Sequence, residues 1–378
     1  MRIDPQRIRD AQSLLARHFG PTRIARAASL SSPGHDVFLK LETDLPTGSF
    51  KVRGAIYALS MKLERDGLRT APGSLEVVCA STGNHGAAVA YAARLLGVRA
   101  TIFLPIDPNP VKAARIRDLG ARLVESGADL SAAIDAAQEY ATRASAFFLH
   151  DASDPDVPVG TATIGAEIVE QLPGVDVIYV PMGDTALIRG VASAAKQHRP
   201  SIRIVGVVAE RAPAYLLSWR KSRGAAETDV VAFRPADAVG LPPPRSALRR
   251  VSPKQSEGGK VRTTSDQVSD VVETATCDTI ADGLAIRRPL APNVAAIRDL
   301  VDDVVMVSEE EMIAAIDLLY AREQVIAEPA GAAATAALLK NPAAAATSVV
   351  LVTGSNIAPA LDPSRRRREG AEKKEETD

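Results

Sequence analysis

The feature of this sequence that most constrains its fold is an alternation of short strand-like runs with longer helical runs, which begins near Glu76. The two kinds of run differ in their content of β-branched residues and in the spacing of their apolar residues. Strands are predicted at residues 77–79, 101–104, 177–180, 204–208 and 349–352, and helices at residues 87–96, 111–119, 130–142, 164–171, 187–197 and 329–339. Strands joined through helices pair in parallel, and such sheets are covered by helices on both faces. The alternation therefore predicts an α/β fold with parallel-rich twisted sheets flanked by helices.

Local patterns predict two further elements. Residues 37–41 form an apolar run that is typical of a strand. Ser308 can cap a helix that starts at Glu309, and Glu311 can reach back to the Ser308 amide, which is the pattern of a capping box. Apolar residues follow at helical spacing, so a helix is predicted from about residue 309 to residue 322.

Length and composition restrict the class of protein. The chain has 378 residues, more than one hydrophobic core usually supports, so two domains are expected. Lys and Arg number 45 and Asp and Glu number 46, so the net charge of −1 attracts neither nucleic acid nor an anionic membrane. The two cysteines are far apart, the N-terminus lacks the apolar core of a signal peptide, and no apolar stretch is long enough to span a bilayer. We therefore expect a soluble cytoplasmic protein that acts on a small molecule, with no metal site and no nucleic-acid or membrane partner.

Two segments interrupt the alternation. Residues 221–270 are rich in Arg, Ser, Pro, Gly and Asp, include consecutive prolines at 242–244, and show no sustained apolar period. We predict a mobile surface insertion there, which contributes little to the core and which limited proteolysis cuts first. The tail at residues 363–378 has one alanine as its only apolar residue, so it is predicted to be disordered.

The segment GSFKVRGA at residues 48–55 carries the first candidate for chemistry. Lys51 lies between an aromatic residue and the start of a predicted helix, where its amine can be partly desolvated and can act as a Schiff-base nucleophile. Most lysines, however, are solvated surface groups. This segment alone therefore does not identify a catalytic residue.

The segment ASTGNHG at residues 80–86 lies directly between a predicted strand and a predicted helix. Such a corner presents hydroxyl groups, an amide and backbone N–H groups at the positive end of a helix, which suits the carboxylate of a substrate. The alternative is that Ser81 and Asn84 only cap the helix, and that His85 is an ordinary residue of its first turn.

Six segments taken together carry a resemblance to a known family. They are GSFKVRGA at 48–55, ASTGNHG at 80–86, PMGDTAL at 181–187, TIADGLA at 279–285, EPAGA at 328–332 and TGSN at 353–356. In this order they resemble the fold-type II family of enzymes that depend on pyridoxal 5′-phosphate (PLP), which have the two-domain fold of the tryptophan synthase β chain. Within that family the sequence is most similar to threonine/serine dehydratases, over about residues 20–220 and 271–360.

The resemblance implies roles for individual residues. Lys51 matches the lysine that forms a Schiff base with PLP and moves the α-proton of the substrate. Asn84 matches the asparagine that hydrogen-bonds the phenolic oxygen of the cofactor, and Phe50 and Arg53 belong to the motif around the lysine. The residues matched to binding of the substrate carboxylate are Ser81, Thr82, Asn84 and His85.

Two threonines carry further implications of the resemblance. Thr82 lies where family members that racemise amino acids have a hydroxyl base on the opposite face of the substrate, although threonine is bulkier and stiffer than serine. Thr353 lies where the family commonly has a serine facing the pyridine nitrogen of PLP, and a hydroxyl there leaves that nitrogen neutral. A neutral ring is a weaker electron sink, which favours β-elimination over reactions that need a long-lived carbanion.

The loop at residues 183–187 departs from the family pattern. The family has three or four glycines whose N–H groups form a nest for the phosphate, whereas this chain has Gly183, Asp184, Thr185, Ala186 and Leu187. An aspartate beside a phosphate dianion is repulsive unless its carboxylate faces away or is paired with a cation such as Arg189. We predict that PLP binds with Asp184 turned outward and the other four loop residues facing the phosphate. Asp184→Gly should then change PLP affinity only modestly.

The resemblance also implies an architecture and a reaction. A smaller α/β domain is expected at residues 43–150 and a larger one at residues 1–42 and 151–362, with PLP in the cleft between them. The expected reaction is β-elimination from a small hydroxy-amino acid, which yields a 2-oxo acid and ammonia. L-threonine and L-serine are both open as substrates. We expect a homo-oligomer without a folded C-terminal regulatory domain.

Three alternative functions stay open. A β-replacement enzyme or a threonine synthase shares the same lysine and asparagine loop but needs a pocket for a second substrate. An amino-acid racemase needs an opposite-face base, for which Thr82 is the candidate. A non-catalytic ligand-binding homologue would account for the altered phosphate loop, and a large gain in PLP affinity on Asp184→Gly would favour it.

Overall fold

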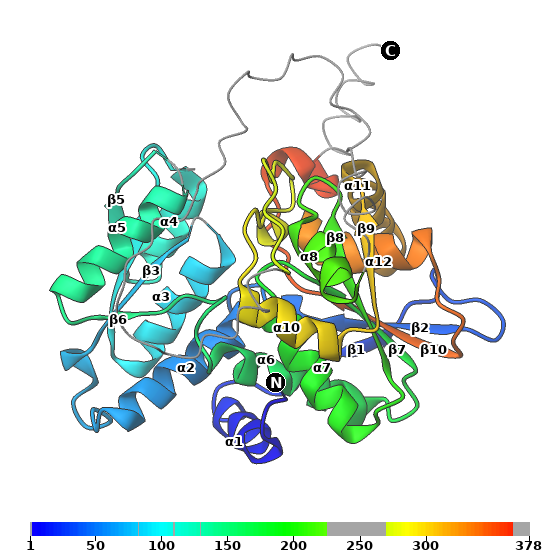
Figure 1. Cartoon of the computed structure of the whole chain (residues 1–378), viewed down its shortest axis with the longest axis horizontal. Helices are drawn as coiled ribbons and strands as arrows, with labels where there is room; N and C mark the ends of the chain where they lie inside the picture. The colour runs from blue at the N-terminus through cyan, green and yellow to red at the C-terminus, as the bar shows by residue number, and fades with distance from the viewer. Residues whose placement is uncertain (1, 82, 109, 129, 225–269, 366–378) are drawn as a thin grey trace, which may run out of the picture.

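The fold is described by a computed structural model that covers residues 2–81, 83–108, 110–128, 130–224 and 270–365. Figure 1 shows a four-stranded sheet at the left and a six-stranded sheet at the right, each flanked by helices. The predicted α/β fold class is confirmed. Most of the predicted insertion, residues 225–269, lies outside the described residues, as do residues 366–378 of the predicted tail, whereas residues 363–365 form part of a helical turn.

The larger sheet contains six strands in the order β1-β2-β10-β7-β8-β9. Their bounds are β1 Ile24–Arg26, β2 Asp36–Leu41, β7 Val177–Pro181, β8 Arg203–Ala209, β9 Asp303–Val307 and β10 Thr347–Val352. Neighbouring strands are parallel, except that β1 and β2 are antiparallel. The larger sheet is therefore mixed. The alternation of strands and helices predicted β7, β8 and β10, a local pattern predicted β2, and β1 and β9 were not predicted.

Helices cover both faces of the larger sheet because side chains alternate along each strand. On β7, Val177 and Tyr179 pack into a core with α11 and α12, whereas Ile178 and Val180 pack into a core with α6, α7, α8 and α10. The bounds of these helices are α6 Val157–Gln171, α7 Ala186–His198, α8 Ala214–Ser222, α10 Ala291–Leu300, α11 Glu309–Leu318 and α12 Pro329–Lys340. None of the described helices is long and apolar enough to cross a membrane.

The smaller sheet is parallel throughout, with the strand order β5-β4-β3-β6. Its strands are β3 Glu76–Ala80, β4 Arg99–Leu104, β5 Arg122–Glu125 and β6 Phe147–Phe148, and the chain around it contains α2 Lys51–Arg65, α3 Asn84–Leu96, α4 Pro110–Asp118 and α5 Leu130–Arg143. The N-terminal helix α1 Pro5–Leu15 packs mainly on α6. On β3, Val77 and Cys79 pack with α2 and α3, whereas Val78 packs with α5. The edge strands β5 and β6 were not predicted, because such short runs show no period.

The predicted capping box is present at the start of α11. Ser308 Oγ accepts a hydrogen bond from Glu311 N at 3.2 Å, and Glu311 Oε2 accepts one from Ser308 N at 2.8 Å. The predicted helix differs at its far end, since α11 stops at Leu318 and a π-helical turn, Leu319–Glu323, continues it. A local side-chain pattern therefore located the start of this helix better than its end.

We expect Ser308→Ala to lower the free energy of unfolding by about 1 kcal/mol, because it removes an acceptor for an unpaired N–H group at the start of α11. Urea denaturation measures this loss. The control is Ser13→Ala, at an exposed position inside α1 where alanine is the better helix former, and its effect should stay within about 0.5 kcal/mol. Equal losses in the two variants would contradict the capping role of Ser308.

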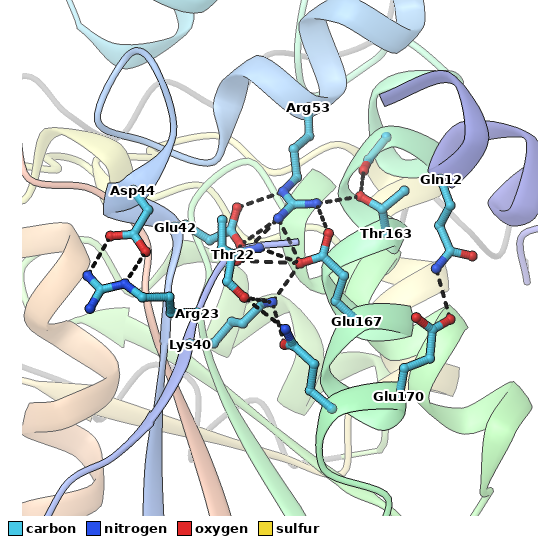
Figure 2. A network of polar contacts seen from close by, with 12 residues as sticks. Gln12, Thr22, Arg23, Lys40, Glu42, Asp44, Arg53, Thr163, Glu167 and Glu170 are labelled. Atoms are coloured by element: carbon cyan, nitrogen blue, oxygen red, sulfur yellow. Dashed lines mark hydrogen bonds and ion pairs between the residues drawn. The ribbon is translucent and has the colours of Figure 1, made fainter. Parts of the chain in front are cut away.

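A buried ionic network fixes the start of α2 to the larger sheet (Figure 2). The Arg53 guanidinium donates to both carboxylate oxygens of Glu42, just after β2, and to both carboxylate oxygens of Glu167 on α6. Glu167 also accepts from Lys40 Nζ at 2.6 Å. These four side chains are at most 8% exposed. Because Arg53 lies half a turn after Lys51, the network determines where the first turn of α2, and with it Lys51, is held.

Candidate active site

Lys51 lies in the interior where segments of the two sheets meet. It is the first residue of α2, and its side chain is 12% exposed, as expected for a partly desolvated lysine at a helix start. Its Nζ donates to Asp151 Oδ2 at 2.6 Å and to Asp184 Oδ2 at 2.5 Å. Asp151 follows β6 of the smaller sheet, and Asp184 follows β7 of the larger sheet. The amine is therefore held between carboxylates from both halves of the molecule.

The two carboxylates determine the charge of Lys51. Burial lowers the pKa of the lysine, but the charges and hydrogen bonds of Asp151 and Asp184 outweigh burial, so the net effect raises the pKa of Lys51. Burial also raises the pKa of the Asp151 carboxyl, whereas the positive charges that face it, from His85 and Lys51 foremost, lower that pKa well below its usual range. The cluster thus holds Lys51 as an ammonium, which has to lose a proton before it acts as a nucleophile or base.

Asp151 is a site residue that the sequence motifs did not indicate. Its Oδ2 lies 3.7 Å from His85 Nδ1, and its Oδ1 lies 3.9 Å from His150 Nδ1. The turn that carries Asp151 is tied to α10, which packs on the larger sheet, because Asn293 Nδ2 donates to Ala152 O at 3.0 Å. The position of Asp151 after a strand could have indicated it. Ligands of α/β sheets bind beyond the carboxyl ends of the strands, and Asp151 closely follows the end of β6.

Residues 80–86, the segment that carries Asn84, form hydrogen bonds with segments that flank the larger sheet. Asn84 Nδ2 donates to Glu328 Oε1 at 2.6 Å, and Asn84 Oδ1 accepts from Asn356 Nδ2 at 2.6 Å. Ser81 Oγ accepts from Gly83 N at 3.2 Å. The N-cap residue of α3 is Gly83, and no side chain caps the helix. The alternative interpretation, in which Ser81 and Asn84 only cap α3, is therefore wrong.

His85 faces the interior from the first turn of α3. Its ring Nε2 lies 3.1 Å from Leu149 O, and the residue is 7% exposed. Burial lowers the pKa of this imidazole, and the nearby Asp151 charge opposes that effect. It is not the ordinary first-turn residue of the alternative interpretation. Thr82, the predicted substrate-binding and catalytic threonine, lies outside the described residues.

Phe50 and Thr353 lie next to one another at the end of β10. Phe50 N donates to Thr353 O at 3.1 Å, and the Phe50 ring lies 5.5 Å from Lys51 Nζ. Thr353 is buried, and its Oγ1 donates to Ala330 O at 3.4 Å. Ser49 Oγ is also buried and has no hydrogen-bond partner among the described residues. The structure therefore brings the lysine segment and the segment after β10 together.

The loop predicted to hold the phosphate connects β7 to α7. Its Thr185 is the N-cap residue of α7 and has a φ of 73°, a conformation that favours glycine. Thr185 Oγ1 is buried and has no hydrogen-bond partner among the described residues. A Cβ atom on Gly183 would lie 1.9 Å from Gly283 O, so packing alone requires glycine there. A buried hydroxyl without a partner at a helix N-terminus is suited to an anionic ligand.

Asp184 is not turned outward, which corrects the prediction from the sequence and removes the basis for the modest effect expected of Asp184→Gly. Its side chain is 9% exposed, its Oδ1 accepts from Ala186 N at 2.8 Å, and its Oδ2 accepts from Lys51 Nζ. Arg189, the expected cationic partner, donates instead to Ala152 O at 3.2 Å. The physical reason is that the Lys51 amine, 133 positions away in sequence, approaches the loop in the fold and supplies the positive charge.

The site combines a buried lysine, the loop that carries Asn84 and the N-terminus of α7. This arrangement is typical of enzymes in which a lysine amine reacts with a cofactor that carries an anionic group. The chain is a member of the pyridoxal-phosphate dependent enzyme family, whose model matches residues 15–268 and 251–354. The family resemblance inferred from the motifs is confirmed, and PLP is the cofactor of this family.

Individual relatives support the same family. The L-threonine ammonia-lyase of Thermotoga maritima is 33% identical over 326 residues, which cover 86% of this chain and 68% of that protein. The catabolic L-threonine dehydratase of Escherichia coli is 30% identical over 297 residues, 79% of this chain and 74% of that protein. Maize serine racemase has a TM-score of 0.77 at 25% identity, covering 100% of this chain and 99% of that one. The threonine deaminase of T.th. has a TM-score of 0.75 at 26% identity, covering 94% and 99%.

Proposed function

We propose that the chain is an ammonia-lyase that uses PLP to remove the β-hydroxyl group of a small hydroxy-amino acid, releasing a 2-oxo acid and ammonia. The observation that carries the proposal is the Lys51 amine, which lies 2.6 Å and 2.5 Å from carboxylates at strand ends of the two sheets. The similarity to proteins named L-threonine ammonia-lyase and L-threonine dehydratase supports the reaction class. When bound, PLP supplies an aldehyde that joins to an amine and a ring that accepts electrons released at the substrate Cα.

The residues around Lys51 fit this cofactor. Thr185 has a buried hydroxyl without a partner among the described residues, and it lies at the N-terminus of α7, where backbone N–H groups favour an anion. Thr353 O accepts from Phe50 N, next to the lysine, and Asn84 Oδ1 accepts from Asn356 Nδ2 in the same segment as Thr353. The proposed cofactor residues are Lys51 for the aldehyde, Gly183, Thr185, Ala186 and Leu187 for the phosphate, Asn84 for the phenolic oxygen, Thr353 for the ring nitrogen and Phe50 beside the lysine.

Lys51 moves the proton in the proposed reaction. As a neutral amine it takes the α-proton of the substrate, and the adjacent carboxylate of Asp151 favours the ammonium that results. The Cβ–O bond then breaks, and the oxygen leaves as water when it receives a proton. Hydrolysis of the released enamine gives ammonia and 2-oxobutanoate from L-threonine, or pyruvate from L-serine. Ser81, Thr82, Asn84 and His85 are the proposed residues for the substrate carboxylate.

Amino-acid racemisation is the second candidate function. The observation in its favour is the similarity to maize serine racemase, which covers 100% of this chain. Racemisation needs a base on the face of the substrate opposite Lys51, and Thr82 is the candidate that the sequence offers.

We further propose the domain limits inferred from the sequence, 43–150 for the smaller domain and 1–42 with 151–362 for the larger one, and a homo-oligomer in the cytoplasm.

The proposed activity predicts a specific outcome of an amino-acid screen. Purified protein with added PLP should release 2-oxo acid from L-threonine, L-serine or both, measured with a 2-oxo acid reagent, together with one ammonia per turnover. Chiral chromatography of the remaining amino acid tests racemisation in the same samples. Inversion without 2-oxo acid would replace the proposed lyase with a racemase. Protein that binds PLP but converts neither substrate would contradict both candidates.

A further inference from the structure

The carboxylate of Asp184 binds two groups that a PLP site needs. One of its oxygens accepts from Lys51 Nζ at 2.5 Å, and the other accepts from Ala186 N at 2.8 Å, in the first turn of α7. The side chain is 9% exposed, so water competes little for either donor. Asp184 therefore engages both the amine that would join the aldehyde and an amide of the helix end that would hold the phosphate.

The neighbouring Thr185 marks where an external anion would lie. Its hydroxyl is buried and without a partner among the described residues, at the N-cap position of the same helix. A phosphate that accepted from this hydroxyl and from the N–H groups of α7 would lie next to the Asp184 carboxylate. The two anions would compete for the Ala186 amide and would repel one another, because little solvent separates them.

We propose that Asp184 is an internal competitor for the phosphate group of the cofactor. In the cofactor-free protein its carboxylate holds the Lys51 amine and the N-terminus of α7, and PLP loads only when this carboxylate moves away from the helix end. Asp151 has its own contact with Lys51, at 2.6 Å, so movement of Asp184 would leave the lysine one of its two carboxylates. The proposal rests on the proposed PLP site and not on the choice of substrate.

Binding of pyridoxine 5′-phosphate tests the proposal without turnover. This compound carries the phosphate of PLP but no aldehyde, so it cannot join to Lys51, and fluorescence titration gives its Kd. Asp184→Asn keeps an oxygen for the Ala186 amide and removes the charge. We expect this variant to bind the compound roughly tenfold or more tightly than the wild type. Unphosphorylated pyridoxine should show no comparable gain.

Asp151→Asn is the matched control, because it removes the other carboxylate from Lys51 without touching the helix end. We expect a clearly smaller gain in affinity for pyridoxine 5′-phosphate than with Asp184→Asn. If Asp184→Asn folds poorly, Asp184→Ser provides a second neutral variant that can still cap α7. Unchanged or weaker binding in folded neutral Asp184 variants would overturn the proposal, and so would an equal gain with Asp151→Asn. Turnover of the wild type is measured separately, so failure of the proposed function stays distinguishable.

Discussion

Replacing Lys51 with arginine should abolish the near-visible absorption of protein-bound PLP that borohydride can trap, and should reduce 2-oxo acid release by about 10³-fold or more. Arginine tests the amine separately from the charge. It keeps a positive charge between Asp151 and Asp184 but stays protonated and cannot form the bond to the aldehyde. Lys51→Ala should lose the same activity. It also leaves two buried carboxylates without their cation, so it should be less stable than Lys51→Arg.

Lys62→Ala is the control for this prediction. Lys62 lies on the same helix but forms a partly exposed ion pair with Asp66, with side chains 29% and 32% exposed. We expect normal absorption and normal turnover in this variant, and a change in stability within about 0.5 kcal/mol. A Lys51→Arg protein that still released 2-oxo acid at the wild-type rate would show that Lys51 is neither the cofactor lysine nor the base.

The sequence predicted the framework of the fold because that information is local. The strands β3, β4, β7, β8 and β10 and most helices between them were predicted, since each has a period or a β-branched run of sufficient length. The capping box at Ser308 was predicted for the same reason. The edge strands β5 and β6 are too short to carry a period, and their place in the sheet depends on β4 and β3, with which they pair.

The site was predicted in part. The residues that were missed or misplaced lie far from Lys51 in the sequence. Lys51 and the asparagine loop lie in motifs that indicate them, whereas Asp151 lies in none and joins the cluster only through the fold, 100 positions from the lysine. Asp184 was noticed, but its orientation was predicted from its expected repulsion of the phosphate. Its actual direction follows from the Lys51 amine, whose approach no local pattern shows.

Arg53→Met should lower the free energy of unfolding by about 3–5 kcal/mol, because it leaves Glu42 and Glu167 buried without the guanidinium that binds them. A cavity of about 460 Å³ adjoins this network and is lined in part by Arg53 and Glu167, so water can reach the Glu167 carboxylate, which favours the lower end of the range. Urea denaturation measures the loss. Arg23→Ala is the control, since Arg23 pairs with Asp44 at the surface and should cost less than about 1 kcal/mol.

The pH dependence of this loss distinguishes an unpaired charge from a simple packing defect. Burial raises the pKa of Glu167, but in the wild type the hydrogen bonds and charges of Arg53 first and of Lys40 second outweigh burial and lower that pKa. Glu167 therefore stabilises the wild type above its unfolded pKa of about 4.3, and this contribution is lost as the pH falls through the lower folded value. Without Arg53 the pKa of Glu167 rises. Acid therefore neutralises the buried carboxylate in the variant, whereas in the wild type acid removes the stabilising contribution of ionised Glu167. The difference in unfolding free energy between wild type and Arg53→Met should therefore shrink from pH 7 to pH 4. A difference independent of pH would assign the loss to packing, and the network would then not act through charge.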